Sequence, residues 1–310
     1  ARPAGFRLAT HPIMFDDLPM SRRGCLHERT VSLTSINATI RQAQHGAATI
    51  AYAVVGPKAA DAPTLCLIAS TGRGPEDFTA MAQYLAAKGV RVVLPWPRGV
   101  GESRGETGDI DFHDLAGDAL AALEAEAGSG GAFMAGHAYG CWIARAAAQA
   151  RPDMISGLIL IAAGAGSWPV ELSRAIEVAM DSDRARQDRL DALRLAFFAD
   201  GHDPSHWLTG WHHDLVAMQR AARQRTDRAS WWPSGIAPIL DIIGLADPFR
   251  PEGDLEFYVR ELGPRVHLRT IEGASHALPD EKPDETARGI LDWLHAQKKI
   301  QTAATAGAVS

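Results

Sequence analysis

The chain has 310 residues, of which 46% are hydrophobic and 22% charged, a composition typical of a globular protein with one large domain or two small ones. The formal net charge of −6 argues against the basic surface that a nucleic-acid partner or an anionic membrane requires. No apolar run approaches the roughly 20 residues of a membrane-spanning helix. We therefore expect neither nucleic acid nor a membrane among the partners.

Cysteine and histidine spacing favours neither a disulfide framework nor a metal site. Cys25, Cys66 and Cys141 are odd in number and widely separated, which is typical of a protein from a reducing cytoplasm. The 12 histidines contain no His-Glu-x-x-His pattern. No glycine-rich phosphate loop follows the first predicted buried strand, so nucleotide binding is not indicated. We expect a cytoplasmic protein without a metal or another cofactor.

The predicted elements begin after an N-terminal extension. Residues 1–35 show no periodicity, and the alternation that follows predicts a hairpin turning near residues 44–46. Short apolar runs then alternate with segments of helical spacing. Buried strands are predicted at residues 64–70, 90–97, 132–136, 156–164, 236–244 and 265–273. Helices are predicted at residues 77–89, 111–128, 141–150, 251–263 and 284–299.

This alternation predicts one α/β core with an inserted cap. Strands and helices in turn indicate parallel strands joined by right-handed crossovers, which is a doubly wound, mostly parallel sheet. Residues 167–233 interrupt the pattern with helical segments and no strand. We therefore expect an α/β core of residues 36–166 and 234–299, with a helical cap between them. Residues 300–310 are expected to form a flexible tail.

Three positions directly after predicted strands are the candidates for a functional site. Ligands of parallel sheets bind beyond the carboxyl ends of the strands. Ala138 follows one strand in "GHAYG", Asp247 follows a second in "GLADPF", and His276 follows a third in "EGASHALP". Asp241, inside a predicted strand, is an alternative acid to Asp247.

These motifs together resemble the α/β-hydrolase fold family, whose catalytic residues occur in the order serine, acid, histidine. "GHAYG" is similar to the family's Gly-x-Ser-x-Gly elbow, with Ala138 in place of serine. "PRGVGES" resembles its Arg-Gly-x-Gly-x-Ser loop, although Trp96 stands where aspartate is common. The resemblance covers residues 36–299. It implies an α/β-hydrolase fold and hydrolysis of a carboxylic ester or lactone.

The resemblance also implies a role for each site residue. Asp247 would orient His276 and stabilise its protonated ring, leaving the other nitrogen as a base. The N–H of Tyr139 would be one oxyanion donor. The N–H of Thr71 would be the second, with Ser70 as a near alternative. Gly136 and Gly140 are expected because side chains would collide in so tight a turn.

Ala138 leaves three readings of the function open. A methyl group cannot attack a carbonyl, and Cys141 is expected to be buried in the following helix rather than to act as a substitute. The first reading is a serine hydrolase whose serine has been replaced by alanine, which leaves an inactive chain. The second is a serine-independent enzyme whose base is the His276–Asp247 dyad, which would act as a cofactor-free oxygenase or lyase or direct water at a reactive ester or lactone. The third is a ligand-binding protein without activity.

Aromatic residues of the predicted cap suggest a small apolar substrate. Five of the eight tryptophans fall there, and their alternative role is to attach the cap to the core: Trp168, Trp207, Trp211, Trp231 and Trp232. His202 and His206 also lie in this segment, but Pro204 intervenes. We expect them to be solvated or capping residues rather than metal ligands.

Overall fold

A computed structural model of the chain describes residues 33–307. Most of the predicted N-terminal extension and the last three residues lie outside this range. Within it, one sheet contains eight strands in the order β1-β2-β4-β3-β5-β6-β7-β8. The strands are β1 (Thr39–His45), β2 (Ala48–Val55), β3 (Thr64–Ile68), β4 (Arg91–Pro95), β5 (Ala132–His137), β6 (Ile155–Ile161), β7 (Ile239–Gly244) and β8 (Val266–Ile271).

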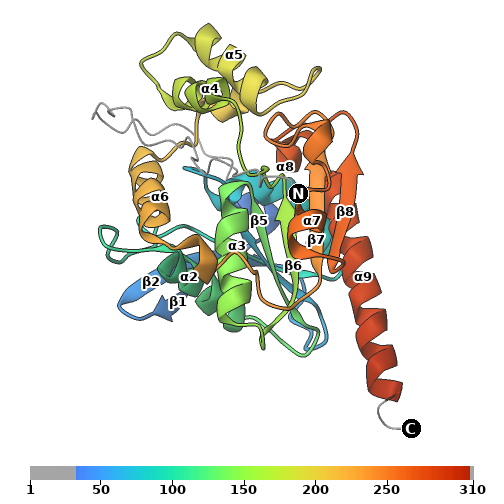
Figure 1. Cartoon of the computed structure of the whole chain (residues 1–310). Coiled ribbons are helices and arrows are strands. Elements are labelled where there is room, and N and C mark those ends of the chain that lie inside the picture. Colours follow the sequence, from blue (N-terminus) through green and yellow to red (C-terminus); the bar gives the residue numbers. More distant parts are fainter. Residues whose placement is uncertain (1–32, 308–310) are drawn as a thin grey trace, which may run out of the picture.

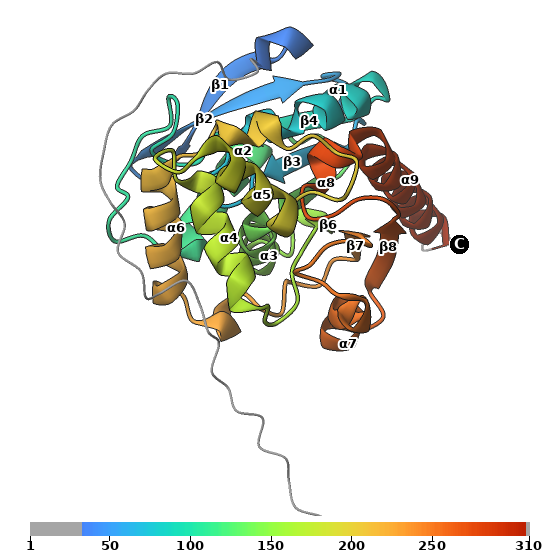
Figure 2. The same cartoon turned by 90° about the horizontal axis from the view of Figure 1, so that it is seen from above.

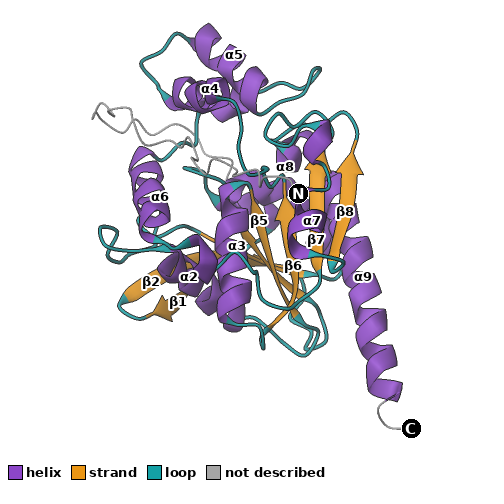
Figure 3. Ribbon diagram, viewed as in Figure 1, coloured by secondary structure: helices purple, strands orange, loops and turns teal. Residues whose placement is uncertain are grey.

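The strands pair as a mostly parallel sheet. β1 and β2 form the predicted hairpin, and β2 also pairs antiparallel with β4. All other neighbouring strands are parallel. The loops after β3, β5, β6, β7 and β8 therefore emerge at one edge of the sheet (Figure 3). This confirms the predicted fold class.

Helices cover both faces of the sheet (Figure 1). A separate apolar core lies under the helices of each face. α2 (Phe112–Glu124) and α3 (Tyr139–Ala150) pack together on one face. α1 (Thr79–Ala87) and α9 (Pro283–Gly307) pack together on the other. α7 (Phe257–Leu262) lies between β7 and β8 in the chain.

Residues 167–233, which we call the insert, connect β6 to β7. The insert contains α4 (Val170–Met180), α5 (Arg186–Ala196), η3 (Ser205–Leu208), α6 (His213–Arg225) and η4 (Arg228–Ser230). Seen from above, α4 and α5 lie over the central part of the sheet (Figure 2). A third apolar cluster joins side chains of the insert to Phe249 and Ala277, which follow β7 and β8. The insert therefore packs directly on the loops that carry Asp247 and His276.

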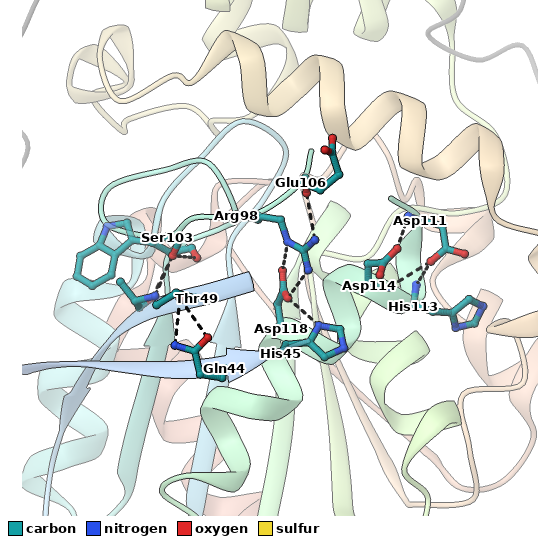
Figure 4. A network of polar contacts seen from close by, with 12 residues as sticks. Gln44, His45, Thr49, Arg98, Ser103, Glu106, Asp111, His113, Asp114 and Asp118 are labelled. Atoms are coloured by element: carbon teal, nitrogen blue, oxygen red, sulfur yellow. Dashed lines mark hydrogen bonds and ion pairs between the residues drawn. The ribbon is translucent and has the colours of Figure 1, made fainter. Parts of the chain in front are cut away.

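The loop after β4 is held by buried polar side chains (Figure 4). Arg98 donates two hydrogen bonds to the Asp118 carboxylate of α2, at 2.9 and 2.7 Å. His45 of β1 contacts the same carboxylate at 2.9 Å. The Ser103 hydroxyl donates to the Trp96 carbonyl oxygen at 2.9 Å and accepts the Ala51 N–H at 3.0 Å. The "PRGVGES" motif thus stabilises this loop rather than supplying a reactive group.

Several element boundaries differ from the prediction. α9 continues to Gly307, eight residues beyond the predicted end of the last helix at residue 299. This segment contains three alanines and no proline, and glycine is reached only at its end, so nothing in it stops the helix. Three short elements were not predicted, η1 (Leu33–Ile36), η2 (Pro75–Phe78) and α8 (Leu278–Glu281). Among residues 33–307, no helix combines the length and the apolarity needed to span a bilayer.

Candidate active site

Ala138 occupies a strained turn between β5 and α3. Its backbone has φ 50° and ψ −110°, a conformation that L-residues rarely adopt. A Cβ at Gly136 would lie 2.1 Å from the carbonyl carbon of Gly140. A Cβ at Gly140 would lie 2.3 Å from the carbonyl oxygen of Ile68 in β3. The two glycines are therefore needed because backbone meets backbone on both sides of the turn.

The apex of this turn is partly exposed while its neighbours are buried. The Ala138 N–H donates to the Ile161 carbonyl oxygen of β6 at 2.9 Å, which fixes the turn to the sheet. Cys141 is fully buried, and its thiol donates to the Gly136 carbonyl oxygen at 2.9 Å. Burial also raises the pKa of this thiol, so Cys141 cannot replace the absent nucleophile.

His276 and Asp247 form a buried pair. His276 Nδ1 lies 2.9 Å from Asp247 Oδ2, and the two residues are 6% and 2% exposed. The second carboxylate oxygen accepts the Phe249 N–H at 2.8 Å. The carboxylate therefore favours the tautomer with the proton on Nδ1, which leaves Nε2 as the nitrogen that can accept a proton.

Asp241, the alternative acid to Asp247, pairs with Arg250 and not with His276. It forms a fully buried ion pair with Arg250, at 2.5 Å, and both side chains are inaccessible to solvent. Arg250 also donates to the carbonyl oxygens of Ala163 and Asp254, each at 2.8 Å. Arg250 thus ties the loop after β7 to β7 itself and to the loop after β6. Asp241 supports the loop of Asp247 and does not contact His276.

His137, the residue before the apex, was not predicted to contribute to the site. It is fully buried, and its Nε2 donates to the His276 carbonyl oxygen at 2.7 Å. The rings of His137 and His276 are 5.6 Å apart. This contact joins the end of β5 to the histidine loop, so two of the three predicted site segments meet here. Its only signal in the sequence is a polar residue at the end of an otherwise apolar strand.

Glu281 of α8 holds the histidine loop from the other side. Its carboxylate accepts the Ser275 N–H at 2.7 Å and the Ala199 N–H of the insert at 2.6 Å. Burial raises the pKa of Glu281, against the opposing effect of these two donors. The loop of His276 is therefore fixed to both α8 and the insert.

The two predicted oxyanion donors lie on adjoining segments. Tyr139 is the first residue of α3, so its N–H has no acceptor within the helix. Thr71 lies in the turn after β3, where the Arg73 N–H donates to the Ser70 carbonyl oxygen at 3.2 Å. The close approach of Gly140 to Ile68 brings the start of α3 against the end of β3. Thr71 and Tyr139 therefore follow two segments, the end of β3 and the elbow, that are in backbone contact.

Aromatic rings surround the His276 imidazole. The distance between ring centroids is 4.4 Å to Phe249 and 5.8 Å to Phe197, which follows α5. Trp207 is fully buried beside Phe197, and its indole N–H donates to Asp280 at 2.7 Å. The imidazole is thus packed against aromatic rings, while its Nδ1 is hydrogen-bonded to the Asp247 carboxylate.

Trp231, His202 and His206 of the insert serve packing and hydrogen bonding. Trp231 packs on Phe112 of α2 at 5.5 Å, within the core on the α2 and α3 face. His202 donates to the Gly273 carbonyl oxygen at 2.9 Å, and His206 contacts Asp280 at 3.1 Å. Within residues 33–307, no group of three or more metal-ligating side chains is arranged to hold an ion.

The chain belongs to the α/β hydrolase family, because the model of that family matches residues 66–289. Solved structures share the fold. A membrane phospholipase A described as a bacterial virulence factor aligns with a TM-score of 0.66 and 23% identity, over 86% of this chain and 91% of that one. An esterase from Thermogutta terrifontis aligns with a TM-score of 0.65 and 22% identity, over 84% and 100%.

A third structure, the enol-lactonase from Burkholderia xenovorans LB400, aligns with a TM-score of 0.63 and 22% identity, over 82% and 100% of the two chains. Comparison with curated proteins gave no match. At these identities the structural similarity establishes the fold and not the substrate.

Removing one partner of the buried ion pair is expected to destabilise the protein strongly. Asp241→Leu leaves the Arg250 charge buried without its carboxylate, and such changes cost about 3–5 kcal/mol. The double variant Asp241→Leu, Arg250→Met should recover much of that loss because no charge remains buried. Urea denaturation measures each value. Asp191→Leu, which removes the exposed Arg194–Asp191 pair of α5, is the control and should cost no more than about 1 kcal/mol.

The stability of the protein is expected to fall in acid through His137. Burial lowers the pKa of His137 to about 4, against 6.5 in the reference state. Between these values the unfolded chain binds a proton that the folded chain does not, so stability falls as the pH decreases from 6.5 towards 4. The difference amounts to roughly 3 kcal/mol at pH 4.

His137→Gln tests this expectation because its amide can still donate to the His276 carbonyl oxygen but does not titrate. Unfolding free energies of the two proteins should converge by roughly 3 kcal/mol between pH 7 and pH 4. The exposed His295, substituted in the same way, provides the control. Parallel stability curves for the parent protein and His137→Gln would contradict the assignment of the buried neutral imidazole.

Proposed function

We propose that the chain is a serine-independent hydrolase that cleaves a carboxylic ester or lactone of a small apolar compound. The observation that carries this proposal is the His276–Asp247 pair at 2.9 Å, positioned in the same fold as the strained elbow at Ala138. The elbow and the dyad are the costly parts of a hydrolytic site. Both are formed here although residue 138 is alanine and carries no hydroxyl group.

In the proposed reaction, His276 is the general base and water is the nucleophile. Nε2 accepts a proton from water, and the oxygen attacks the carbonyl carbon of the substrate. Asp247 stabilises the imidazolium that forms. The tetrahedral intermediate then expels the alkoxide, which takes the proton back from Nε2. An ester gives a carboxylic acid and an alcohol, a lactone gives a single hydroxy acid, and no covalent enzyme intermediate is needed.

The proposed oxyanion donors are the N–H groups of Thr71 and Tyr139. Each would donate to the carbonyl oxygen as its negative charge develops, and one such donor contributes about 3 kcal/mol to lowering the barrier. The start of α3 adds the positive end of the helix dipole at the same point. Because water is the nucleophile and no acyl-enzyme forms, the substrate would be a reactive ester or lactone. The two donors would stabilise the oxyanion that forms when water attacks its carbonyl carbon.

The substrate and the setting are proposed on three grounds. The rings of Phe249 and Phe197 beside His276 favour an apolar substrate, and the insert above the loops would act as the cap. Structures with this fold include an esterase and an enol-lactonase. Cys66 and Cys141 are unpaired and buried, in keeping with a cytoplasmic protein.

A second candidate function is proton abstraction by the same dyad, as in a lyase or a cofactor-free oxygenase. The observation that favours it is the enclosure of His276 by aromatic rings, because an apolar site limits competition by water. The base would then remove a proton next to a carbonyl group, and the N–H donors would stabilise the resulting enolate.

A reactive aryl ester such as 4-nitrophenyl acetate tests the proposal. The chain as it stands should hydrolyse it, and His276→Ala should lower kcat/KM by about 100-fold or more because the general base is lost. His267→Ala, an exposed histidine in β8, is the matched control and should change little. Activity is measured by release of nitrophenolate under steady-state conditions.

Ala138→Ser separates the proposal from its alternatives. Restoring the hydroxyl should add a pre-steady-state burst, because a covalent acyl-enzyme then forms. Activity confined to the serine variant would instead identify the chain as an inactive form of a serine hydrolase. Absence of turnover in both proteins, together with tight binding of an apolar ligand, would identify a binding protein.

A further inference from the structure

Two consecutive residues of the loop after β3, Gly72 and Arg73, form hydrogen bonds to the insert. The Gly72 N–H donates to the Gln219 side-chain oxygen at 2.9 Å, and the Gly72 carbonyl oxygen accepts the His212 N–H at 2.9 Å. The next residue, Arg73, donates to the Thr209 carbonyl oxygen at 2.7 Å. Both backbone groups of the residue adjoining Thr71 are therefore bonded to the insert.

The fit between this loop and α6 is tight. Gly72 has φ +65°, and a Cβ there would lie 2.5 Å from the Val216 methyl group. Val216 and Gln219 are three residues apart and so share one face of α6. This face lies directly on Gly72. The position of the loop is thus set by α6, which follows it by more than a hundred residues in the chain.

Gln219 also reaches the second proposed donor. Its backbone carbonyl oxygen accepts the hydroxyl of Tyr139 at 3.1 Å. Gln219 is only 5% exposed, and both of its hydrogen bonds are buried. One residue of the insert therefore bonds to Tyr139 on the elbow side and to the neighbour of Thr71 on the loop side.

We propose that Gln219 is a positioning residue that sets the spacing between the two oxyanion donors. This inference rests on the proposed function, since it takes Thr71 and Tyr139 as the donors. The spacing matters because both N–H groups must point at a single oxygen atom, and small misplacements cost large factors in rate. The insert then contributes to the catalytic geometry as well as covering the site.

Other contacts keep the loop folded when Gln219 is changed. Arg73 is buried and makes two hydrogen bonds to the Asp77 carboxylate, at 2.8 and 2.6 Å. Its guanidinium also lies over the rings of Trp207 and Trp211, at 4.5 and 4.9 Å. A change at Gln219 should therefore shift the donors without detaching the loop from the insert.

Gln219→Met tests the proposal because methionine has a similar length but a poor acceptor. With 4-nitrophenyl acetate, kcat should fall by about 10- to 100-fold while KM changes by less than about threefold, since the oxyanion forms only after the substrate has bound. Gln219→Glu keeps an oxygen acceptor for the Gly72 N–H and should recover most of kcat. Gln224→Met, on the exposed side of α6, is the matched control.

Hydrogen exchange makes the test independent of turnover. The Gly72 amide should exchange at least about tenfold faster in Gln219→Met than in the parent protein, and Gln219→Glu should restore its protection. If the parent protein does not hydrolyse the ester, the proposed function fails. The exchange rate of the Gly72 amide still decides whether Gln219 anchors the loop. Unchanged kcat in a folded Gln219→Met protein, or unchanged exchange at Gly72, would overturn the inference.

Tyr139→Phe provides a second variant that removes only a hydroxyl group. It breaks the bond to the Gln219 carbonyl oxygen and leaves the Gly72 bond in place. We expect a smaller loss of kcat than in Gln219→Met, again with little change in KM. If KM rises in both variants while kcat stays unchanged, the contacts of Gln219 serve substrate binding and not donor spacing.

Discussion

The close backbone contact between β3, the elbow and α3 is the constraint on which the site depends. Gly136 and Gly140 have no side chains that would prevent this contact. Ala138 adopts a strained backbone conformation there, with a φ of 50°. Such a conformation costs about 1–3 kcal/mol, and the hydrogen bond from Ala138 to Ile161 of β6 helps to hold it. A turn whose sole task was to join a strand to a helix would not need this strain. It places the apex residue, the start of α3 and the end of β3 at one point.

Much of the fold and part of the site follow from the sequence. Apolar runs and helical spacing located the strands and most helices because each element has its own periodicity, and the parallel arrangement follows from their alternation. Ala138, Asp247 and His276 were found because each directly follows a strand. In the structure, Asp247 Oδ2 lies 2.9 Å from His276 Nδ1. The catalytic roles of these residues and the limits of the cap remain proposals.

The supporting contacts could not be predicted in the same way. His137 contacts the carbonyl oxygen of His276, and Gln219 reaches Gly72, although each pair is more than a hundred residues apart in the chain. Periodicity describes which face of an element is buried and carries no information on which distant element covers it. Asp241 shows the same limit: its position on β7 suggested a catalytic acid, but only the fold reveals that Arg250 neutralises it.

The contact of Gly72 with Val216 and Gln219 of α6 has a consequence for protein engineering and for the divergence of related enzymes. The insert packs on the loops that carry Asp247 and His276, so replacing it with the corresponding segment of a related protein is one way to change substrate selectivity. A replacement segment would also have to bring an acceptor for the Gly72 amide and a carbonyl group for the Tyr139 phenol. Chimeras that ignore this pair of contacts would change turnover when they were designed to change selectivity alone.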